Sequence, residues 1–283
     1  MCRAETSVMV NACTGKMGHA VAEAVVRAGL DLIPFSITGE SEAVVVGNVG
    51  VSGIPVQLVG ADKRQQAISD IMRDKPGLIV VDFTLPGAVN ENAKFYCDNG
   101  LPFVMGTTGG DRVQLTRDTE ESGVYAVIAP QMGKQVVAFQ ATMEMMAQNF
   151  PGAFSGYKLS VRESHQRTKV DTSGTAKEIV RSFQQLGVEP FEVDAIQRVR
   201  EAGQQMGEMH VPEKALSGHA FHTYHLTSPD GTVNFEFQHN VVGREIYAEG
   251  TVDAVLFLAS KIKEKAEQRI FNMVDVLRAG AMR

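Results

Sequence analysis

Short apolar runs alternate with amphipathic stretches throughout the first half of this chain. The apolar runs are SVMVNA (7–12), LIPFSIT (32–38), GLIVVDFT (77–84), LPFVMGTTG (101–109) and VYAVIAP (124–130). Several of them, such as LIVV, are apolar at consecutive positions, which is typical of strands that are covered on both faces. The alternation therefore predicts βαβ units and a parallel sheet between layers of helices.

Composition and charge narrow the class of protein further. With 283 residues, 44% of them hydrophobic and 21% charged, the chain is long enough for two domains of ordinary globular composition. No apolar run approaches the roughly 20 residues of a membrane span. The net charge is −6 and the cations are scattered, which argues against a nucleic-acid partner. Cys2, Cys13 and Cys97 lack C-x-x-C spacing, so we expect a reducing compartment and neither disulfides nor a zinc site.

A glycine turn follows the first apolar run. In NACTGKMGH, the residues Thr14, Gly15, Lys16, Met17 and Gly18 stand between a strand and a helix that ends at Gly29. Glycines let backbone N–H groups approach a pyrophosphate, while the helix terminus faces the anion. The turn lacks the first glycine of the usual dinucleotide fingerprint, and the alternative is a turn whose glycines only satisfy packing. Its position near the start of the chain favours a Rossmann-like nucleotide-binding domain.

The end of the second strand bears on the choice between NAD and NADP. A carboxylate there would bind the ribose 2′-hydroxyl and repel a 2′-phosphate. Thr38 stands about where that acid is expected, the nearest carboxylates are Glu40 and Glu42, and Lys16 can supply a cation. The sequence thus predicts a preference for NADP.

Three later strand ends carry small polar residues at the edge of the sheet where ligands bind. We expect the nucleotide to contact Phe83 and Thr84, then Gly106, Thr107 and Thr108, and finally Pro130 and Gln131. For Thr84 and Thr107, ordinary turn chemistry is an equally good explanation.

A different pattern follows APQMGKQ, which we interpret as a hinge. The segments DAIQRVR, HAFHTYHLTS and TVNFEFQHNVV are candidate strands without strong helices between them, which predicts an α+β domain with a mixed sheet. The amphipathic helix TVDAVLFLASKIKEKAEQRI is expected to pack back on the first domain. We therefore expect a dinucleotide-binding domain over 1–133 and 252–283, and a substrate-binding and oligomerisation domain over 134–251.

Three histidines in HAFHTYH suggest a metal site, but their spacing argues against one. Successive side chains on a strand alternate between faces, so His222 points away from His219 and His225. We expect no metal.

The run VRESHQRTKVDTSGTAKEIV (161–180) combines candidate acid-base residues with a helix start. Thr175 and Glu178 have the spacing of a capping box, and the apolar positions after them predict a helix from about Ala176. The helix terminus is an anion site within reach of Lys169, and His165 can exchange a proton near neutral pH. The alternative is a polar loop capped for helix stability, which would leave His165 and Lys169 without a joint role.

This run resembles the signature E-x-H-H-x-x-K-x-D-A-P-S-G-T-A of the dihydrodipicolinate reductase family. The resemblance spans essentially the whole chain, through G-K-M-G, VDFT, GTTG and HNVVGREIYAEGTVDAVLFL. Gln166 replaces the second histidine, and DTSGTA is one residue shorter than the pattern. With APQMGKQ and HAFHTYHLTSPD, these departures resemble the plant-type branch. That branch would imply a plastid stroma location with a transit peptide absent here, whereas another source would imply the cytoplasm.

The resemblance implies an activity and a set of residues. The activity is reduction of 4-hydroxy-tetrahydrodipicolinate to tetrahydrodipicolinate with loss of water, in lysine and diaminopimelate biosynthesis, with NADPH as cofactor and NADH as the alternative. His165 and Lys169 would be catalytic, and Gln166, Ser173, Gly174, Thr175 and Arg244 would bind a cyclic dicarboxylate. An arginine can hold a carboxylate bidentately, whereas Gln166 cannot carry a proton. We also expect a homo-oligomer, a dimer or a tetramer.

Two other functions compete with this one. A homoserine or diaminopimelate dehydrogenase would use the same two domains, but it would not require H-x-x-x-K before S-G-T. A non-catalytic NADP-sensing module would bind nucleotide and leave Lys169 and His165 idle.

Overall fold

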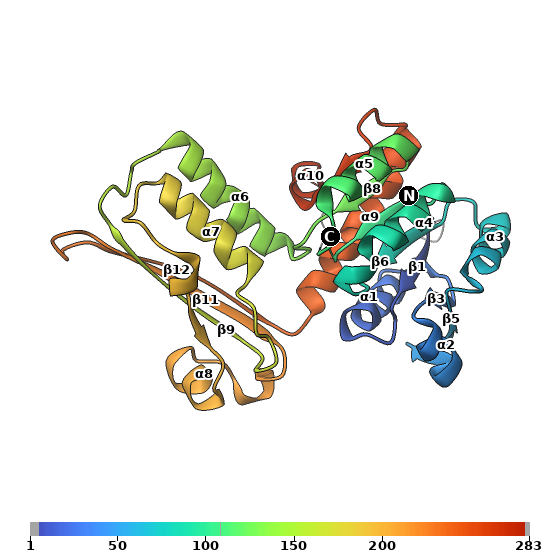
Figure 1. The fold of residues 1–283 in the computed structure, drawn as a ribbon, viewed down its shortest axis with the longest axis horizontal. Helices are drawn as coiled ribbons and strands as arrows, with labels where there is room; N and C mark the ends of the chain where they lie inside the picture. Colours follow the sequence, from blue (N-terminus) through green and yellow to red (C-terminus); the bar gives the residue numbers. More distant parts are fainter. Residues whose placement is uncertain (1–5, 108, 281–283) are drawn as a thin grey trace. The chain divides into compact units, whose positions relative to one another are not determined.

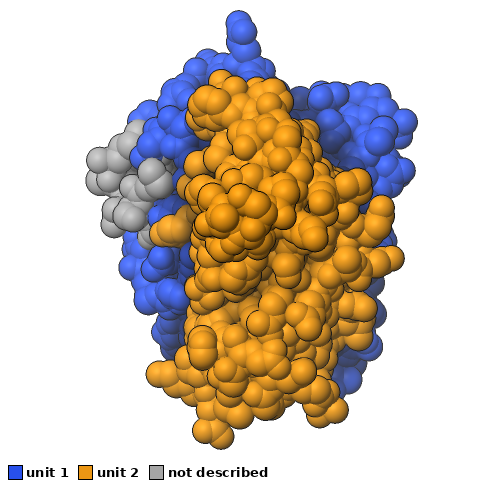
Figure 2. All heavy atoms as spheres, turned by 90° about the vertical axis from the view of Figure 1, so that its left-hand side faces the viewer, with its two compact units in different colours: residues 1–134, 245–283 blue, residues 135–244 orange. Residues whose placement is uncertain are grey.

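The computed structural model describes residues 6–107 and 109–280, and within them the chain divides into two compact units. Unit 1 comprises residues up to 134 together with 245–283, and unit 2 comprises residues 135–244 (Figure 2). The chain returns to unit 1 at Glu245, where the long helix α9 begins, whereas the sequence had suggested residue 252. Within the described residues, no helix combines the length and apolar character that a bilayer span requires.

Unit 1 is built on a six-stranded parallel sheet in the order β13-β8-β7-β6-β1-β2 (Figure 1). Its strands are β1 (Ser7–Asn11), β2 (Asp31–Leu32), β6 (Ile79–Asp82), β7 (Phe103–Met105), β8 (Ala126–Ile128) and β13 (Ile270–Phe271). A smaller sheet joins β3 (Phe35–Ile37), β4 (Asn48–Val51) and β5 (Ile54–Val59). The run 32–38 is split because Pro34 interrupts it, and its two halves enter different sheets.

Helices cover both faces of the large sheet, as consecutive apolar strand residues require. All residues of β1 and β6 are buried. One face packs with α4 and α5 around Met9, Val80, Tyr96, Phe103 and Leu115, and α1 contacts α9 elsewhere in the unit. The unit's helices are α1 (Lys16–Arg27), α2 (Glu40–Val46), α3 (Arg64–Asp74), η2 (Pro86–Ala88), α4 (Val89–Asp98), α5 (Arg112–Ser122), α9 (Glu245–Glu264) and α10 (Met273–Arg278).

Unit 2 is a four-stranded mixed sheet in the order β10-β9-β11-β12, with β10 parallel to β9 and the other pairs antiparallel. Its strands are β9 (Lys158–His165), β10 (Gln197–Val199), β11 (His219–Thr227) and β12 (Asn234–Val242). Its helices are α6 (Lys134–Asn149), α7 (Gly174–Gln185), η3 (Val193–Ala195), α8 (Ala202–Glu208) and η4 (Glu213–Ala215). Helices α6 and α7 lie side by side over one face of this sheet (Figure 1) and pack through Met143, Ile179 and Phe183 against Val161 and Tyr224.

The predicted fold class, a Rossmann-like parallel-sheet unit followed by an α+β unit with a mixed sheet, is therefore confirmed.

Candidate functional site

The glycine turn of unit 1 has the geometry of an anion cradle. Ala12 takes a left-handed conformation with φ of 55°, and the N–H of Gly15 donates to its carbonyl at 3.0 Å. A Cβ on Gly18 would overlap that same carbonyl oxygen, so only glycine lets α1 start so close to β1. Helix α1 has no side-chain cap and no acid in its first turn, and Lys16 is exposed at its first position. The uncapped helix terminus and its dipole thus favour an anion such as a pyrophosphate, and Lys16 stands at the first helical position.

The other strand-end residues follow adjacent parallel strands. Because β8, β7, β6 and β1 are neighbours and parallel, Gln131, Thr107, Thr84 and the glycine turn follow the same edge of the sheet. The Phe83 ring packs so close to Gly106 that a Cβ there would overlap it. Pro130 is exposed, and the side chain of Gln131 accepts from the N–H of Gly133 at 2.9 Å. Thr108 lies outside the described residues.

A fully buried acid, Asp82, organises this edge, and sequence reasoning missed it. One carboxylate oxygen accepts from both the N–H and the hydroxyl of Thr84, at 2.8 and 2.6 Å. The other accepts from the Tyr96 hydroxyl at 2.5 Å and from Asn92 at 3.0 Å. Burial and the adjacent carboxylate raise the pKa of Tyr96. The Thr84 hydroxyl is thus engaged in the turn, which supports the structural alternative for that residue.

Thr38 lies beside the glycine turn, with two carboxylates near it. Residue Ile37, directly before it, accepts from the N–H of Ala12 at 3.1 Å. The Thr38 hydroxyl donates to the carboxylate of Glu42, and Glu40 packs against Gly60. Glu42, one of the two carboxylates that the sequence analysis named as nearest to Thr38, therefore contacts it directly.

In unit 2, the residues of the 161–180 run come together between the end of β9 and the start of α7. Helix α7 begins at Gly174 and not near Ala176, and its cap is Ser173, whose hydroxyl accepts from the N–H of Ala176 at 3.5 Å. The predicted capping box of Thr175 and Glu178 was therefore wrong, and the helix begins two residues before the expected position. The physical reason is Glu163, which accepts from the N–H of Ser173 at 2.9 Å and fixes that residue in its non-helical conformation.

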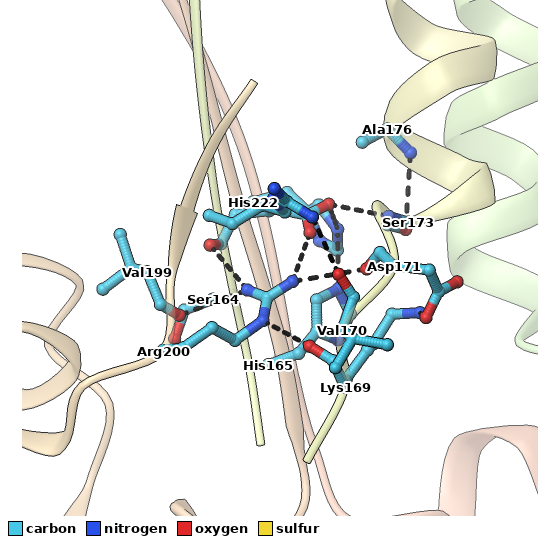
Figure 3. Close-up of polar contacts among 12 residues, drawn as sticks. Ser164, His165, Lys169, Val170, Asp171, Ser173, Ala176, Val199, Arg200 and His222 are labelled. Atoms are coloured by element: carbon cyan, nitrogen blue, oxygen red, sulfur yellow. Dashed lines mark hydrogen bonds and ion pairs between the residues drawn. The ribbon is translucent and has the colours of Figure 1, made fainter. Parts of the chain in front are cut away.

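Arg200 lies beside Lys169, Val170 and Asp171 (Figure 3), and together with Glu163 it holds the loop 166–172 in place. The Glu163 carboxylate is fully buried and pairs with the Arg200 guanidinium at 2.6 Å. The same guanidinium donates to the backbone carbonyls of Lys169 at 2.8 Å and Asp171 at 3.5 Å. Arg198 adds a hydrogen bond to the carbonyl of Val170 at 2.8 Å. This loop is therefore fixed by cations from β10 and its C-terminal flank.

Lys169 is partly covered and its charge is balanced by a neighbour. Its side chain is 21% exposed, and the ammonium donates to the carboxylate of Asp171 at 2.7 Å. This hydrogen bond is the main reason why the pKa of Asp171 lies below its ordinary value. A charged, positioned ammonium thus lies on the loop that precedes α7.

His165 is buried, and its imidazole meets a second one. Its Nε2 lies 3.3 Å from Nε2 of His222, which β11 supplies. Burial, then the positive charges of Lys169 and Arg200, lower the pKa of His165 to about 3. His165 is therefore neutral at pH 7. With Glu163, the two imidazoles form a group compact enough to hold a metal ion, a set that differs from the three histidines considered from the sequence.

The remaining predicted residues lie at the same end of the sheet. Ala220 pairs with both His165 and Val241, so Arg244, just after β12, lies near the end of β9. Its guanidinium approaches Gly218. Gln166 and Thr175 are half-buried and Gly174 is exposed.

Of the residues missed in unit 2, Glu163 had a signal in the sequence. On a strand, Val161, Glu163 and His165 share one face, and an acid on an apolar face must be paired. Arg200 and His222 come from distant segments, so nothing in the run itself indicated them.

Two family models match the chain in succession. The model described as "Dihydrodipicolinate reductase, N-terminus" matches residues 6–132, and "Dihydrodipicolinate reductase, C-terminus" matches residues 135–277. An Arabidopsis thaliana protein named 4-hydroxy-tetrahydrodipicolinate reductase 2, chloroplastic, is 58% identical over 98% of this chain and 78% of its own length. A protein from Oryza sativa subsp. japonica, named as a probable chloroplastic 4-hydroxy-tetrahydrodipicolinate reductase 1, is 56% identical over 98% of this chain and 80% of its own length.

A solved structure has the same fold. The dipicolinate-bound dihydrodipicolinate reductase from Paenisporosarcina sp. TG-14 matches with a TM-score of 0.62 at 19% identity, covering 94% of this chain and 97% of that one.

Proposed function

The chain belongs to the dihydrodipicolinate reductase family, and we propose that it carries out that family's reaction with NADPH as the preferred hydride donor. It reduces 4-hydroxy-tetrahydrodipicolinate, a small cyclic dicarboxylate, to tetrahydrodipicolinate with loss of water. The observation that carries the site assignment is the convergence of Lys169, His165 and the start of α7 at one place in unit 2.

Unit 1 is the nucleotide-binding part. The glycine turn and its unneutralised helix terminus suit the pyrophosphate, and the bound nicotinamide supplies the hydride. Lys16 can pair with a 2′-phosphate, and the residue after β3 is Thr38 instead of an acid, which supports the NADPH preference.

Cofactor preference is tested by steady-state kinetics with both nucleotides. We expect kcat/KM to be higher with NADPH, and Lys16→Ala to lower that value about tenfold while leaving the value with NADH nearly unchanged. Lys94→Ala is the matched control, because Lys94 pairs with Asp98 on a distant helix. A higher kcat/KM with NADH would indicate that Glu42 holds the ribose hydroxyl and would overturn the preference.

Unit 2 holds the dicarboxylate. The amides of Gly174 and Thr175 at the start of α7 suit one carboxylate, with the Ser173 cap keeping the terminus in shape. Arg244 can bind the other carboxylate bidentately, and Gln166 can add a hydrogen bond.

The proton that completes the reduction comes from Lys169. Its ammonium is charged and held by Asp171, whereas His165 is neutral at pH 7. His165 therefore acts as a neutral hydrogen-bonding group beside the substrate and orients it. A positioned acid contributes about 10² to 10⁴ in rate.

The site is tested with Lys169→Met and His165→Ala. We expect each variant to lower kcat with 4-hydroxy-tetrahydrodipicolinate by about 10² to 10⁴ while leaving the Kd of NADPH within about twofold. Lys158→Met is the control, because Lys158 lies at the opposite end of β9 from His165. Full turnover in both variants would remove these residues from the mechanism. Turnover of homoserine or diaminopimelate by the wild-type protein, in place of 4-hydroxy-tetrahydrodipicolinate, would overturn the proposed substrate.

We also propose self-association through β12. This strand forms an edge of its sheet, and Phe235 and Val242 on it are 43% and 51% exposed. An exposed, partly apolar edge strand is a template for pairing with another copy. Light scattering should find a homo-oligomer that Phe235→Lys weakens, and a monomeric wild-type protein at micromolar concentration would contradict this.

The chloroplastic names of the Arabidopsis and rice relatives support the plastid stroma as the place of action in a plant. A fluorescent fusion of the complete gene product should accumulate in plastids, and a cytosolic signal would contradict this.

A further inference from the structure

Two buried imidazoles, those of His165 and His222, form a row with the half-buried imidazole of His239 on one face of the unit 2 sheet. His222 of β11 pairs across the sheet with Glu163 of β9 on one side and with His239 of β12 on the other. Its ring stacks on that of His239 with centroids 4.5 Å apart, and it meets the ring of His165 edge to face at 5.0 Å. The side chain of His222 is only 2% exposed. The row thus runs from His165 on β9, through His222 on β11, to His239 on the edge strand β12.

The contact between His165 and His222 needs one hydrogen, and only one. Nε2 faces Nε2 at 3.3 Å, so one ring must donate and the other must accept. Burial is the main cause that lowers the pKa of both rings, and the charges of Lys169 and Arg200 add to it. Both rings are therefore neutral at pH 7, and each carries its hydrogen on a single nitrogen.

The surroundings decide which ring donates. Glu163 Oε2 lies 3.9 Å from Nε2 of His222, and its negative charge favours a hydrogen on that nitrogen. Within the described structure, Nδ1 of His222 is buried and has no partner. Buried N–H groups without an acceptor are rarer than buried acceptors without a donor. His222 thus carries its hydrogen on Nε2 and donates it.

His165 then accepts at Nε2 and carries its own hydrogen on Nδ1.

We propose that His222 is a positioning residue for the reductase reaction, which holds His165 in its Nδ1–H tautomer by donating a hydrogen bond from its own Nε2. This inference rests on the proposed role of His165 at the substrate. It assigns a function to one histidine of the HAFHTYH segment, and that function does not require His219 or His225.

A metal ion held by Glu163, His165 and His222 is the rival arrangement. It is disfavoured because Arg200 and the N–H of Ser173 already occupy both carboxylate oxygens. A metal ligand would also use its second ring nitrogen as a donor, and Nδ1 of His222 has no acceptor.

The test combines kinetics with nitrogen-15 spectra of the histidine side chains, which distinguish the two neutral tautomers. In the wild-type protein, His165 should be protonated on Nδ1. His222→Phe keeps the ring and removes the donor, so the Nε2–H form of His165 should become populated and kcat should fall by about 10². His222→Gln presents an amide N–H near the position of the His222 Nε2–H, so it should restore part of the Nδ1–H population of His165 and part of kcat.

His239→Phe is the matched control, because His239 is half-buried in the same row and stacks on His222. It should leave the His165 tautomer and kcat within about twofold, since a stacking neighbour replaced by another ring loses little. If His222→Phe fails to fold, His222→Gln against His239→Phe supplies the same comparison.

Three results would overturn the inference. A His165 tautomer that stays unchanged in His222→Phe would show that His222 does not set it. Binding of one Zn²⁺ per chain by the wild-type protein, lost in His222→Phe, would establish the metal site instead. A changed tautomer with full turnover would show that the tautomer of His165 is irrelevant to the reaction, and His165→Ala would then separate this failure from failure of the proposed site.

Discussion

At the scale of single residues, Arg200 determines the shape of the candidate substrate site. Its guanidinium bonds the buried carboxylate of Glu163 and the backbone carbonyls of Glu163, Lys169, Asp171 and Val199. One side chain thus neutralises a buried acid and fixes the loop that carries Lys169. Its planar array of donors makes this possible, and lysine could not replace it.

We expect Arg200→Met to destabilise the protein by about 3 to 5 kcal/mol, because it leaves Glu163 charged, buried and unpaired. Urea unfolding measures the loss. Arg198→Met, which loses one bond to the carbonyl of Val170, is the control and should cost about 1 kcal/mol. Adding Glu163→Gln to Arg200→Met should recover part of the loss. Equal effects of the two arginines would disprove this account.

The glycine turn offers a second comparison between residues. Gly18→Ala should weaken NADPH binding more than tenfold, because the new Cβ overlaps the carbonyl of Ala12 and must displace the turn. Gly39→Ala is the control, since nothing lies near its Cβ position and its φ of −62° suits alanine. Calorimetric titration with NADPH measures both, and an unaltered Kd for Gly18→Ala would remove the turn from the nucleotide site.

Residues close together in the sequence were easier to predict than residues that the sheet brings together. The run 161–180 placed His165, Lys169 and the α7 terminus within one loop, where spacing alone indicates proximity. His222 was considered only against its neighbours His219 and His225, because the pairing of β11 with β9 cannot be derived from a single sequence. The family pattern has a second histidine next to His165, where this chain has Gln166. The imidazole that contacts His165 here is instead that of His222, on β11.

At the scale of elements, the alternation of apolar runs predicted the parallel sheet well, because each strand is buried on both faces. Element boundaries were less predictable. The helix expected over 251–270 runs from Glu245 to Glu264, and Ile270 belongs to a strand. Gly250 in its first turns has low helix propensity, and its role depends on a tertiary contact that no local pattern reveals.

That contact explains why a glycine stands inside α9. A Cβ on Gly250 would overlap the carbonyl oxygen of Met132, next to the buried ion pair of Lys134 with Asp253 at 2.5 Å. We expect Gly250→Ala to lower Tm by several degrees despite the better helix propensity of alanine, since about 1 to 3 kcal/mol of overpacking outweighs it. Gly203→Ala, in α8 with open space around it, should be neutral or stabilising. Thermal unfolding of the two variants measures the difference, and an equal Tm for both would contradict close packing at Gly250.

At the scale of the whole molecule, the histidines are unevenly divided between the two units. Of the seven in the chain, His19 alone lies in unit 1, on α1. Burial lowers the pKa of His165 to about 3 and of His239 to about 4, and it lowers that of His222 as well. All three belong to unit 2, and protonating any of them costs that unit stability.

This asymmetry predicts that acid destabilises unit 2 before unit 1. Unfolded histidines bind protons below about pH 6.5, whereas these three do not bind them in the folded state until the pH is far lower. Their contribution to stability is therefore complete above pH 6.5 and is lost as the pH falls toward 4, by up to about 1.4 kcal/mol per pH unit for each histidine. Most carboxylates titrate only below about pH 4.5, so the interval from 6.5 to 4.5 isolates the histidines.

Hydrogen exchange across that interval should show protection falling in β9, β11 and β12 while β1 and β6 keep theirs, and His239→Phe should weaken the dependence of protection on pH. Equal loss of protection in both units would show that the buried imidazoles do not govern acid stability.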